Sequence, residues 1–145
     1  MVLFEYIMSQ STITPEIAKL FEGKNFASFA TLMNDGSPHV APTWVDLDGN
    51  TILINTAGGR VKEKNLRKDN RIALSIYDQE NPYHMVAIRG KVTDLTEIGA
   101  DEHINKMAKK YFGVDKYPFH SEDEKRIILK IQPEKIHHQQ PPPQK

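Results

Sequence analysis

The stretch TAGGRVKEKNLRKDNR, residues 56–71, follows one apolar run and precedes another that alternates apolar and polar residues. Its two glycines, Gly58 and Gly59, predict a turn from a strand into a helix. The backbone N–H groups and the dipole at the start of such a helix attract anions. Arg60 and Lys62 lie at this turn, so they are candidates for binding a phosphate through charge-assisted hydrogen bonds. A solvated basic helix after a glycine turn explains the same residues, and the pattern leaves both interpretations open.

Upstream of this stretch, the sequence predicts one short helix and an antiparallel meander. The helix is capped by Thr12 or Thr14, has Pro15 in its first turn and ends at Gly23. Two Asp-Gly turns follow, and Asp-Gly supplies the positive φ values that tight hairpins need. These turns separate three expected strands, at residues 26–33, 38–47 and 51–56.

Downstream, two further strands, a second helix and a last strand are expected. Gly90 falls on the apolar face of a long strand, which predicts a bend, a bulge or a close approach of another group. Thr96 is expected to cap the second helix, Gly113 to end it, and Pro133 to end the last strand. The ranges are 71–78 and 83–95 for the two strands, 97–112 for the helix, 114–124 for a polar loop and 126–132 for the last strand.

The length and composition fit one domain with two short terminal segments. The chain has 145 residues, 39% of them hydrophobic, and a formal net charge of +0. We expect an N-terminal extension at residues 1–11, a folded domain at 12–136 and a flexible tail at 137–145. Neutral overall charge argues against nucleic-acid binding, and no apolar run reaches membrane-spanning length. Because the start carries Glu5 and lacks a basic segment, we predict no signal peptide and a cytoplasmic location.

No constellation of catalytic or metal-binding residues is visible. Cysteine is absent, which excludes disulfides, thiolate metal sites and cysteine nucleophiles. The six histidines show no metal-ligand spacing, and we predict no metal site. Catalytic residues therefore stay unassigned, as is typical of proteins in which a cofactor carries the chemistry.

An ordered set of segments resembles a known family. The set comprises the Asp-Gly hairpin, the strand PHVAPTW (38–44), the segment ILINTAGGRVKEKNLRKD (52–69), the alternating strand and the strand IRGKV (88–92). It resembles the flavin and deazaflavin split-barrel oxidoreductases related to pyridoxamine 5'-phosphate oxidase, and most closely their deazaflavin-dependent branch. The resemblance covers roughly residues 21–136. It implies a mainly β fold, an FMN-binding-like split β-barrel of antiparallel strands with helices at its rims.

The resemblance also implies a homodimer with two cofactor sites at the subunit interface. One strand would line the ring of the cofactor, two residues of the next would contact the ring edge or ribityl chain, and the glycine turn would bind the phosphate. In that order the implied cofactor-binding residues are His39, Val40, Ala41, Pro42, Thr43 and Trp44, then Asn55 and Thr56, then Arg60 and Lys62 with the backbone of Val61. Trp44 is equally well explained as a core or interface aromatic residue.

Two departures from the oxidases favour coenzyme F-420, an 8-hydroxy-5-deazaflavin, over FMN. The oxidases often carry adjacent Arg-Lys where this chain has Val61-Lys62, and often Gln near the position of Met85. The expected function is hydride transfer between the deazaflavin and a small organic substrate. The basic residues Lys64, Arg67 and Lys68 are solvated in the simplest interpretation, or attract the polyglutamate tail of the coenzyme. The alternatives are an FMN-binding flavoprotein related to pyridoxamine 5'-phosphate oxidase, a non-catalytic cofactor carrier, or a nucleic-acid- or protein-binding barrel.

Overall fold

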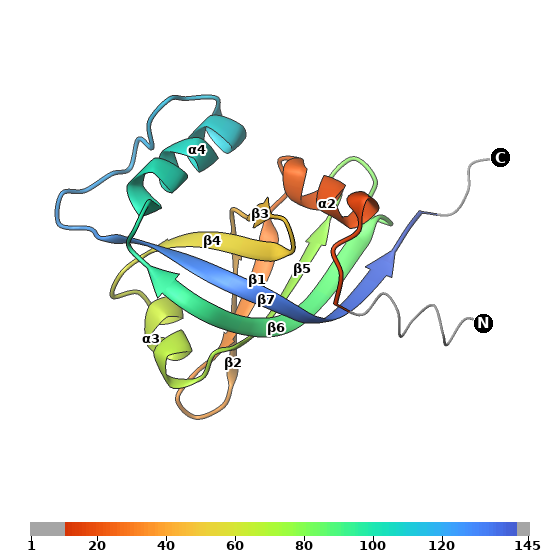
Figure 1. The fold of residues 1–145 in the computed structure, drawn as a ribbon, viewed down its shortest axis with the longest axis horizontal. Coiled ribbons are helices and arrows are strands. Elements are labelled where there is room, and N and C mark those ends of the chain that lie inside the picture. The colour runs from red at the N-terminus through yellow and green to blue at the C-terminus, as the bar shows by residue number, and fades with distance from the viewer. Residues whose placement is uncertain (1–10, 142–145) are drawn as a thin grey trace.

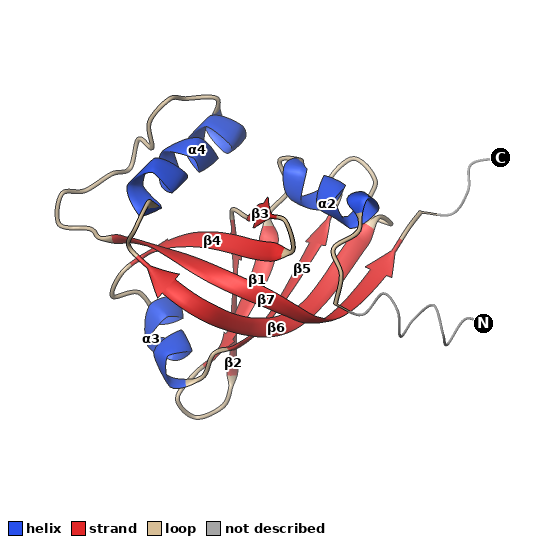
Figure 2. Cartoon of the chain, viewed as in Figure 1, coloured by secondary structure: helices blue, strands red, loops and turns tan. Residues whose placement is uncertain are grey.

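The computed structural model describes residues 11–141, which form a mainly β fold. The sequence prediction of an antiparallel β architecture with rim helices is confirmed (Figures 1 and 2). In chain order the elements are α2 (Pro15–Glu22), β1 (Ala27–Leu32), β2 (Pro38–Thr43), β3 (Asp46–Asp48), β4 (Thr51–Ala57), α3 (Val61–Lys68), β5 (Arg71–Tyr77), β6 (Met85–Thr96), α4 (Ala100–Phe112) and β7 (Arg126–Gln139). The predicted N-terminal extension lies outside the described residues, except for Ser11.

The strands form one sheet in the order β2-β1-β5-β6-β7-β4-β3. The expected simple meander is wrong, because the segment predicted as one strand at 38–47 divides into β2 and β3. The chain leaves β2 at one edge of the sheet and enters β3 at the other edge. Val45, at the crossing, is fully buried, and its N–H donates to the Tyr111 hydroxyl at 3.1 Å. Because the Val45 side chain is buried at this point, the chain leaves β1 here and the first hairpin ends.

A bulge between Arg89 and Gly90 bends the long strands β6 and β7. A Cβ atom added to Gly90 would lie 2.3 Å from the carbonyl oxygen of Gln132, so only glycine fits this close approach. The predicted bulge or close contact is therefore confirmed. Pro133 sits opposite Gly90 and does not end β7, which continues to Gln139. His137, assigned by the sequence to a flexible tail, pairs instead with Ala87.

The core lies inside the curled sheet, between its inner face and two of the helices. Alternate residues of β5, namely Ile72, Leu74 and Ile76, face this core as predicted. α2 adds Ile17, Leu20 and Phe21, and α3 adds Leu66. α2 has the predicted Thr14 cap and ends at Gly23. Figure 1 shows α2 and α3 near opposite ends of the curled sheet.

α4 packs outside the curled sheet, against β4 and β7. It begins at Ala100 after Gly99, which adopts the left-handed conformation with φ 75°, and Thr96 instead ends β6. The predicted cap at Thr96 is therefore wrong, although Gly113 ends the helix as expected. Ile104, Met107 and Ala108 are buried on the helix face that meets the sheet.

Asp46 ties α4 to the short edge strand β3. Its Oδ2 atom accepts hydrogen bonds from His103 Nε2 at 3.0 Å and from Lys106 Nζ at 3.2 Å. Burial of the carboxylate opposes its ionisation, but the hydrogen bonds from His103, the Leu47 N–H and Lys106 outweigh this effect and lower the pKa of Asp46 to about 2. The carboxylate is therefore more readily ionised in the folded chain than in the unfolded chain, whose ordinary value is 3.8.

We predict that Asp46→Asn lowers the free energy of unfolding by about 1–2 kcal/mol at pH 7. The folded pKa is depressed, so the contribution of Asp46 is fully present above its ordinary pKa and is lost as pH falls from about 4 towards 2. Urea unfolding between pH 7 and pH 3 measures this. The difference from wild type should shrink on acidification, whereas Asp48→Asn, on the exposed end of the same strand, should change little. A difference that stays constant with pH contradicts the assignment.

Candidate functional site

A pocket of about 230 Å³ gathers residues from the edge strand β2 and from β4 and β7 near the other side of the sheet. It brings together five of the predicted cofactor-binding residues with four that were not predicted. The lining residues are Pro42, Thr43, Trp44, Asn55 and Arg60, together with Phe26, Tyr117, Phe119 and Arg126. The crossing of the chain after β2 places the end of this strand near β4 and β7, and so explains how distant segments meet here.

In the polar wall of the pocket, the donor and the acceptor of each hydrogen bond can be assigned. Arg126 is 5% exposed and donates from Nε to Asn55 Oδ1 at 2.8 Å. Because arginine cannot accept, the amide oxygen of Asn55 must face Arg126. Its NH2 group then faces the Ala100 carbonyl at 2.9 Å and His103 Nδ1 at 3.1 Å. His103 Nδ1 is therefore an acceptor, and the ring carries its hydrogen on Nε2 and donates it to Asp46.

Two arginines share one carboxylate at this wall. Glu124 Oε1 accepts from Arg126 Nη1 at 2.7 Å and from Arg60 Nη2 at 3.3 Å. The Arg126 guanidinium also lies over the Tyr117 ring, 5.2 Å from its centroid. One negative charge thus faces two positive charges, which leaves this wall suited to an anionic group or to a hydrogen-bond acceptor on a planar ligand.

Most of the other residues of the pocket are aromatic. Trp44 stacks on Tyr111 with a centroid separation of 4.9 Å and an interplanar angle of 4°. Phe112 and Tyr117 meet the indole edge-on, at 4.9 and 6.0 Å. Trp44 therefore both packs against α4 and contributes to the pocket, so the two interpretations of this residue are compatible.

The N–H groups of the glycine turn before α3 already have hydrogen-bond acceptors within the chain. The Gly58 N–H donates to the Lys125 carbonyl, and the Gly59 N–H donates to Glu63 Oε1, both at 2.7 Å. The hydrogen bond from the Gly59 N–H lowers the pKa of Glu63, and the hydrogen bond from Arg67 lowers it further. Glu63 is therefore held in the ionised form, which is the stronger acceptor for this internal cap. The two glycine amides that the sequence offered to an anion are thus occupied, and the case for an anion site rests on Arg60 and Lys62.

Lys62 is half-buried at the first turn of α3. Burial, and next the nearby charge of Arg60, lower its pKa from the ordinary value. Within residues 11–141 no carboxylate lies within 4 Å of its ammonium group. A partly desolvated cation without an acidic partner gains stability when an anion binds beside it.

The other predicted residues lie outside this pocket. His39 and Ala41 are partly buried on the edge strand β2, and His39 Nδ1 is buried without a hydrogen-bond partner among the described residues. Thr56 is 3% exposed and faces the core beside Ile54, on the opposite side of β4 from Asn55. Val61 is 41% exposed on α3.

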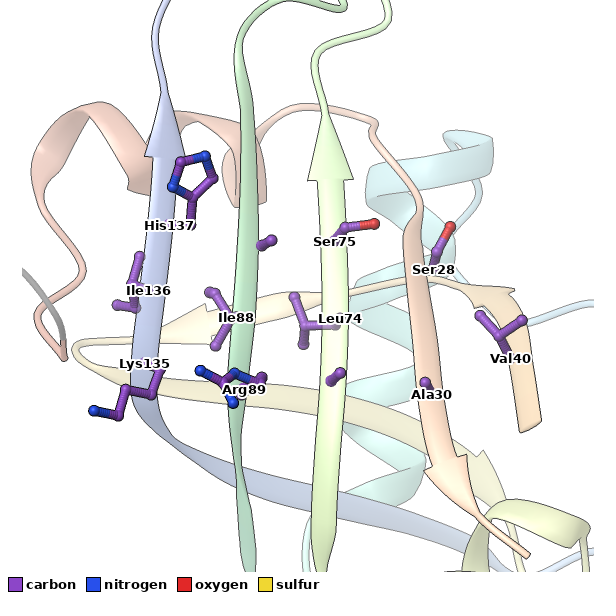
Figure 3. A pocket seen from close by; sticks show the side chains of 12 residues that line it. Ser28, Ala30, Val40, Leu74, Ser75, Ile88, Arg89, Lys135, Ile136 and His137 are labelled. Atoms are coloured by element: carbon purple, nitrogen blue, oxygen red, sulfur yellow. The ribbon is translucent and has the colours of Figure 1, made fainter. Parts of the chain in front are cut away.

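A second pocket, of about 400 Å³, lies on the outer face of the sheet (Figure 3). Its floor consists of small side chains from three adjacent strands: Ser28, Ala30, Ala73, Ser75 and Ala87. Val40, which the sequence assigned to the cofactor site, lies at one margin and is 64% exposed. Arg89, Lys135 and His137 lie at the other margin.

Arg126, Tyr117 and Phe119 are pocket residues that the sequence interpretation missed. Arg126 was placed at the start of a strand with no role, yet an arginine flanking an uninterrupted Ile-Ile-Leu run was a signal of a buried guanidinium. Tyr117 and Phe119 fell in a segment described only as a polar loop. Two aromatic residues in an otherwise polar loop were the available signal there.

Comparison with solved structures shows extensive similarity of fold. An F420 reductase aligns with a TM-score of 0.74 and 26% identity over 82% of this chain and 94% of its own. A conserved hypothetical protein of Mycobacterium tuberculosis aligns with a TM-score of 0.68 and 19% identity over 90% and 87%. General stress protein 26 of Bacillus anthracis aligns with a TM-score of 0.65 and 16% identity over 88% and 93%. The last two similarities concern the fold alone.

Sequence comparisons identify the family. No helix within the described residues has the length and hydropathy needed to cross a bilayer. A search of curated proteins gives no match.

The sequence profile of pyridoxamine 5'-phosphate oxidase matches residues 13–140, nearly the whole described chain. The chain therefore belongs to the pyridoxamine 5'-phosphate oxidase family, as the order of its segments predicted.

Proposed function

We propose that the protein is a deazaflavin-dependent oxidoreductase that transfers a hydride between the coenzyme and a small organic substrate. One observation carries this proposal: the end of β2, Asn55 and Arg60 meet in one pocket with Arg126. The 26% identical F420 reductase, which aligns over 94% of its own length, supports the deazaflavin over FMN. When bound, the coenzyme would supply the hydride chemistry, and the chain would supply binding and orientation.

The residues present suit such a cofactor. Trp44 and Tyr117 offer apolar surface to a planar ring. Asn55 Oδ1 and the Arg126 guanidinium each keep hydrogen-bonding capacity that no described residue uses, and they offer a polar edge. Arg60 and Lys62 offer two cations for a phosphate, one of them partly desolvated. The hydrogen bonds from Arg126 to Asn55 and Glu124 hold this edge in one arrangement before any ligand binds.

We further propose that the functional unit is a homodimer. The pocket of 230 Å³ is smaller than the roughly 300–1,000 Å³ of pockets that enclose whole ligands, so one chain encloses only part of a long cofactor. The outer face of the sheet offers a floor of small residues on which a second copy can pack closely. Val40, predicted to contact the cofactor, lies at the margin of this face, which links the dimer contact to the site.

The phosphate assignment predicts that Arg60→Gln and Lys62→Gln each weaken cofactor binding by roughly 1.5–3 kcal/mol, because each removes one charged hydrogen bond. Fluorescence titration with the deazaflavin coenzyme measures this. Lys109→Gln removes an equal charge from the exposed side of α4 and should bind as wild type does. Unchanged affinity in both the Arg60 and the Lys62 variant removes these residues from the site.

The dimer assignment predicts that Ala73→Arg produces a monomer that binds cofactor at least about tenfold more weakly, because a long charged side chain cannot pack between two flat faces. Sedimentation velocity and titration test the two effects together. Thr93→Arg, exposed on β6 at a second irregularity in the pairing with β7, serves as the control. A wild-type chain that is monomeric and yet binds the cofactor tightly would contradict the proposal.

The choice of cofactor predicts a difference in salt dependence. Lys64 and Lys68 are exposed on α3, where they can attract the polyglutamate tail of a deazaflavin coenzyme, which FMN lacks. Raising the salt from about 50 to 500 mM should weaken deazaflavin binding more than FMN binding. The double variant Lys64→Gln with Lys68→Gln should remove that difference. If FMN binds more tightly and alone supports turnover, the FMN-dependent alternative replaces the deazaflavin.

A further inference from the structure

A pair of histidines lies apart from the proposed cofactor pocket. His84 Nε2 and His138 Nε2 are 3.0 Å apart, and their ring centroids are separated by 5.1 Å. His84 ends the turn between β5 and β6, and His138 lies in β7 opposite Val86. Neither residue lines the 230 Å³ pocket. Both are half-buried, so an ion in solution can reach them.

Hydrogen bonds hold the backbone in place at both histidines. The His84 N–H donates to the Asn81 carbonyl at 2.9 Å, and the His84 carbonyl accepts from the Asp78 N–H at 2.9 Å. His138 is fixed by the ladder between β6 and β7. Two imidazoles that converge from rigid segments lose little conformational entropy when a ligand binds between them.

The separation of the two nitrogens suits a metal ion with right-angled ligands. Imidazole nitrogens bind divalent metals at about 2.0–2.1 Å, so two of them lie about 2.9 Å apart at 90° and about 3.3 Å apart in a tetrahedron. The observed 3.0 Å is close to the right-angled value. Tetragonal coordination by nitrogen and oxygen is typical of Cu²⁺ and Ni²⁺.

The surroundings allow both nitrogens to act as ligands. Within residues 11–141, neither His84 nor His138 has a hydrogen bond at Nδ1, so each ring can carry its hydrogen there and present the Nε2 lone pair. Glu16, in the first turn of α2, is close enough for its charge to act on both rings. No group of three or more metal-ligand side chains occurs in the described part of the chain, so water or a reoriented Glu16 would complete the coordination.

We propose that His84 and His138 form a binding site for a divalent transition metal, with preference for Cu²⁺ over Zn²⁺. The site joins the turn before β6 to the end of β7, the strand segment that the sequence assigned to a flexible tail. A metal bound by the pair would thus stabilise the contact between the end of β7 and the turn before β6. This site is independent of the proposed oxidoreductase function, and neither depends on the other.

The test uses the full chain without a histidine tag and adds Cu²⁺ alone. We expect one Cu²⁺ per chain and an electron paramagnetic resonance spectrum with superhyperfine coupling to two imidazole nitrogens. His84→Gln and His138→Gln each remove one ligand and should raise the dissociation constant at least about tenfold. Glutamine keeps a hydrogen-bonding side chain, and circular dichroism verifies that both variants are folded.

His137→Gln is the matched control. His137 is the neighbour of His138 on β7 and points to the outer-face pocket instead (Figure 3), so this variant should bind Cu²⁺ as wild type does. The same titration with Zn²⁺ should give weaker binding. The proposal is overturned if wild type shows no saturable binding below about 100 µM Cu²⁺, a range typical of weak metal sites. It is also overturned if His84→Gln and His138→Gln bind Cu²⁺ as wild type does, in which case the pair is only a hydrogen bond.

Discussion

The close approach of Gly90 to the Gln132 carbonyl is the constraint on which the architecture depends. β6 and β7 are the two longest strands, and together they join the β2-β1-β5 half of the sheet to the β4-β3 half. Any side chain at residue 90 would push these strands apart at the bulge. Without that bend the sheet would be flatter, its inner face would enclose less of the core, and β2 would lie farther from β4 and β7, whose residues share the pocket.

The polar wall of that pocket is one end of a chain of hydrogen bonds that continues away from it. Arg126 can only donate, so it fixes the amide of Asn55, and Asn55 fixes the tautomer of His103. His103 in turn bonds Asp46 on the edge strand. The orientation of Asn55 in the pocket is therefore linked to the Asp46 carboxylate on β3 through the ring of His103. A single arrangement satisfies every member of this chain, which is how buried polar networks give rigidity.

Sequence reasoning recovered the elements whose signals are local. The caps of α2, the alternation of β5, the Asp-Gly turns and the special role of Gly90 all follow from residues within a few positions of one another. The pairing of β4 with β7 did not follow, because it depends on where the buried Val45 directs the chain. Arg126 and Tyr117 were missed for the same reason: both meet Asn55 or Arg60 only after β7 has paired with β4. At the glycine turn the sequence predicted N–H groups free to bind an anion. In the structure Glu63, which belongs to the helix that follows, accepts from the Gly59 N–H in place of an anion.

The sheet ends in two outer strands, β2 and β3, each of which pairs with a strand on one side only within residues 11–141. β2 carries Pro38 and Pro42, and a proline has no N–H to offer to another strand. β3 is three residues long and ends on the exposed Asp48. Short length, prolines and acidic side chains are means by which natural sheets avoid recruiting strands from other molecules. Pro42 therefore has two roles. It lines the pocket, and it disfavours pairing of β2 with a strand of another molecule, the contact through which sheets aggregate.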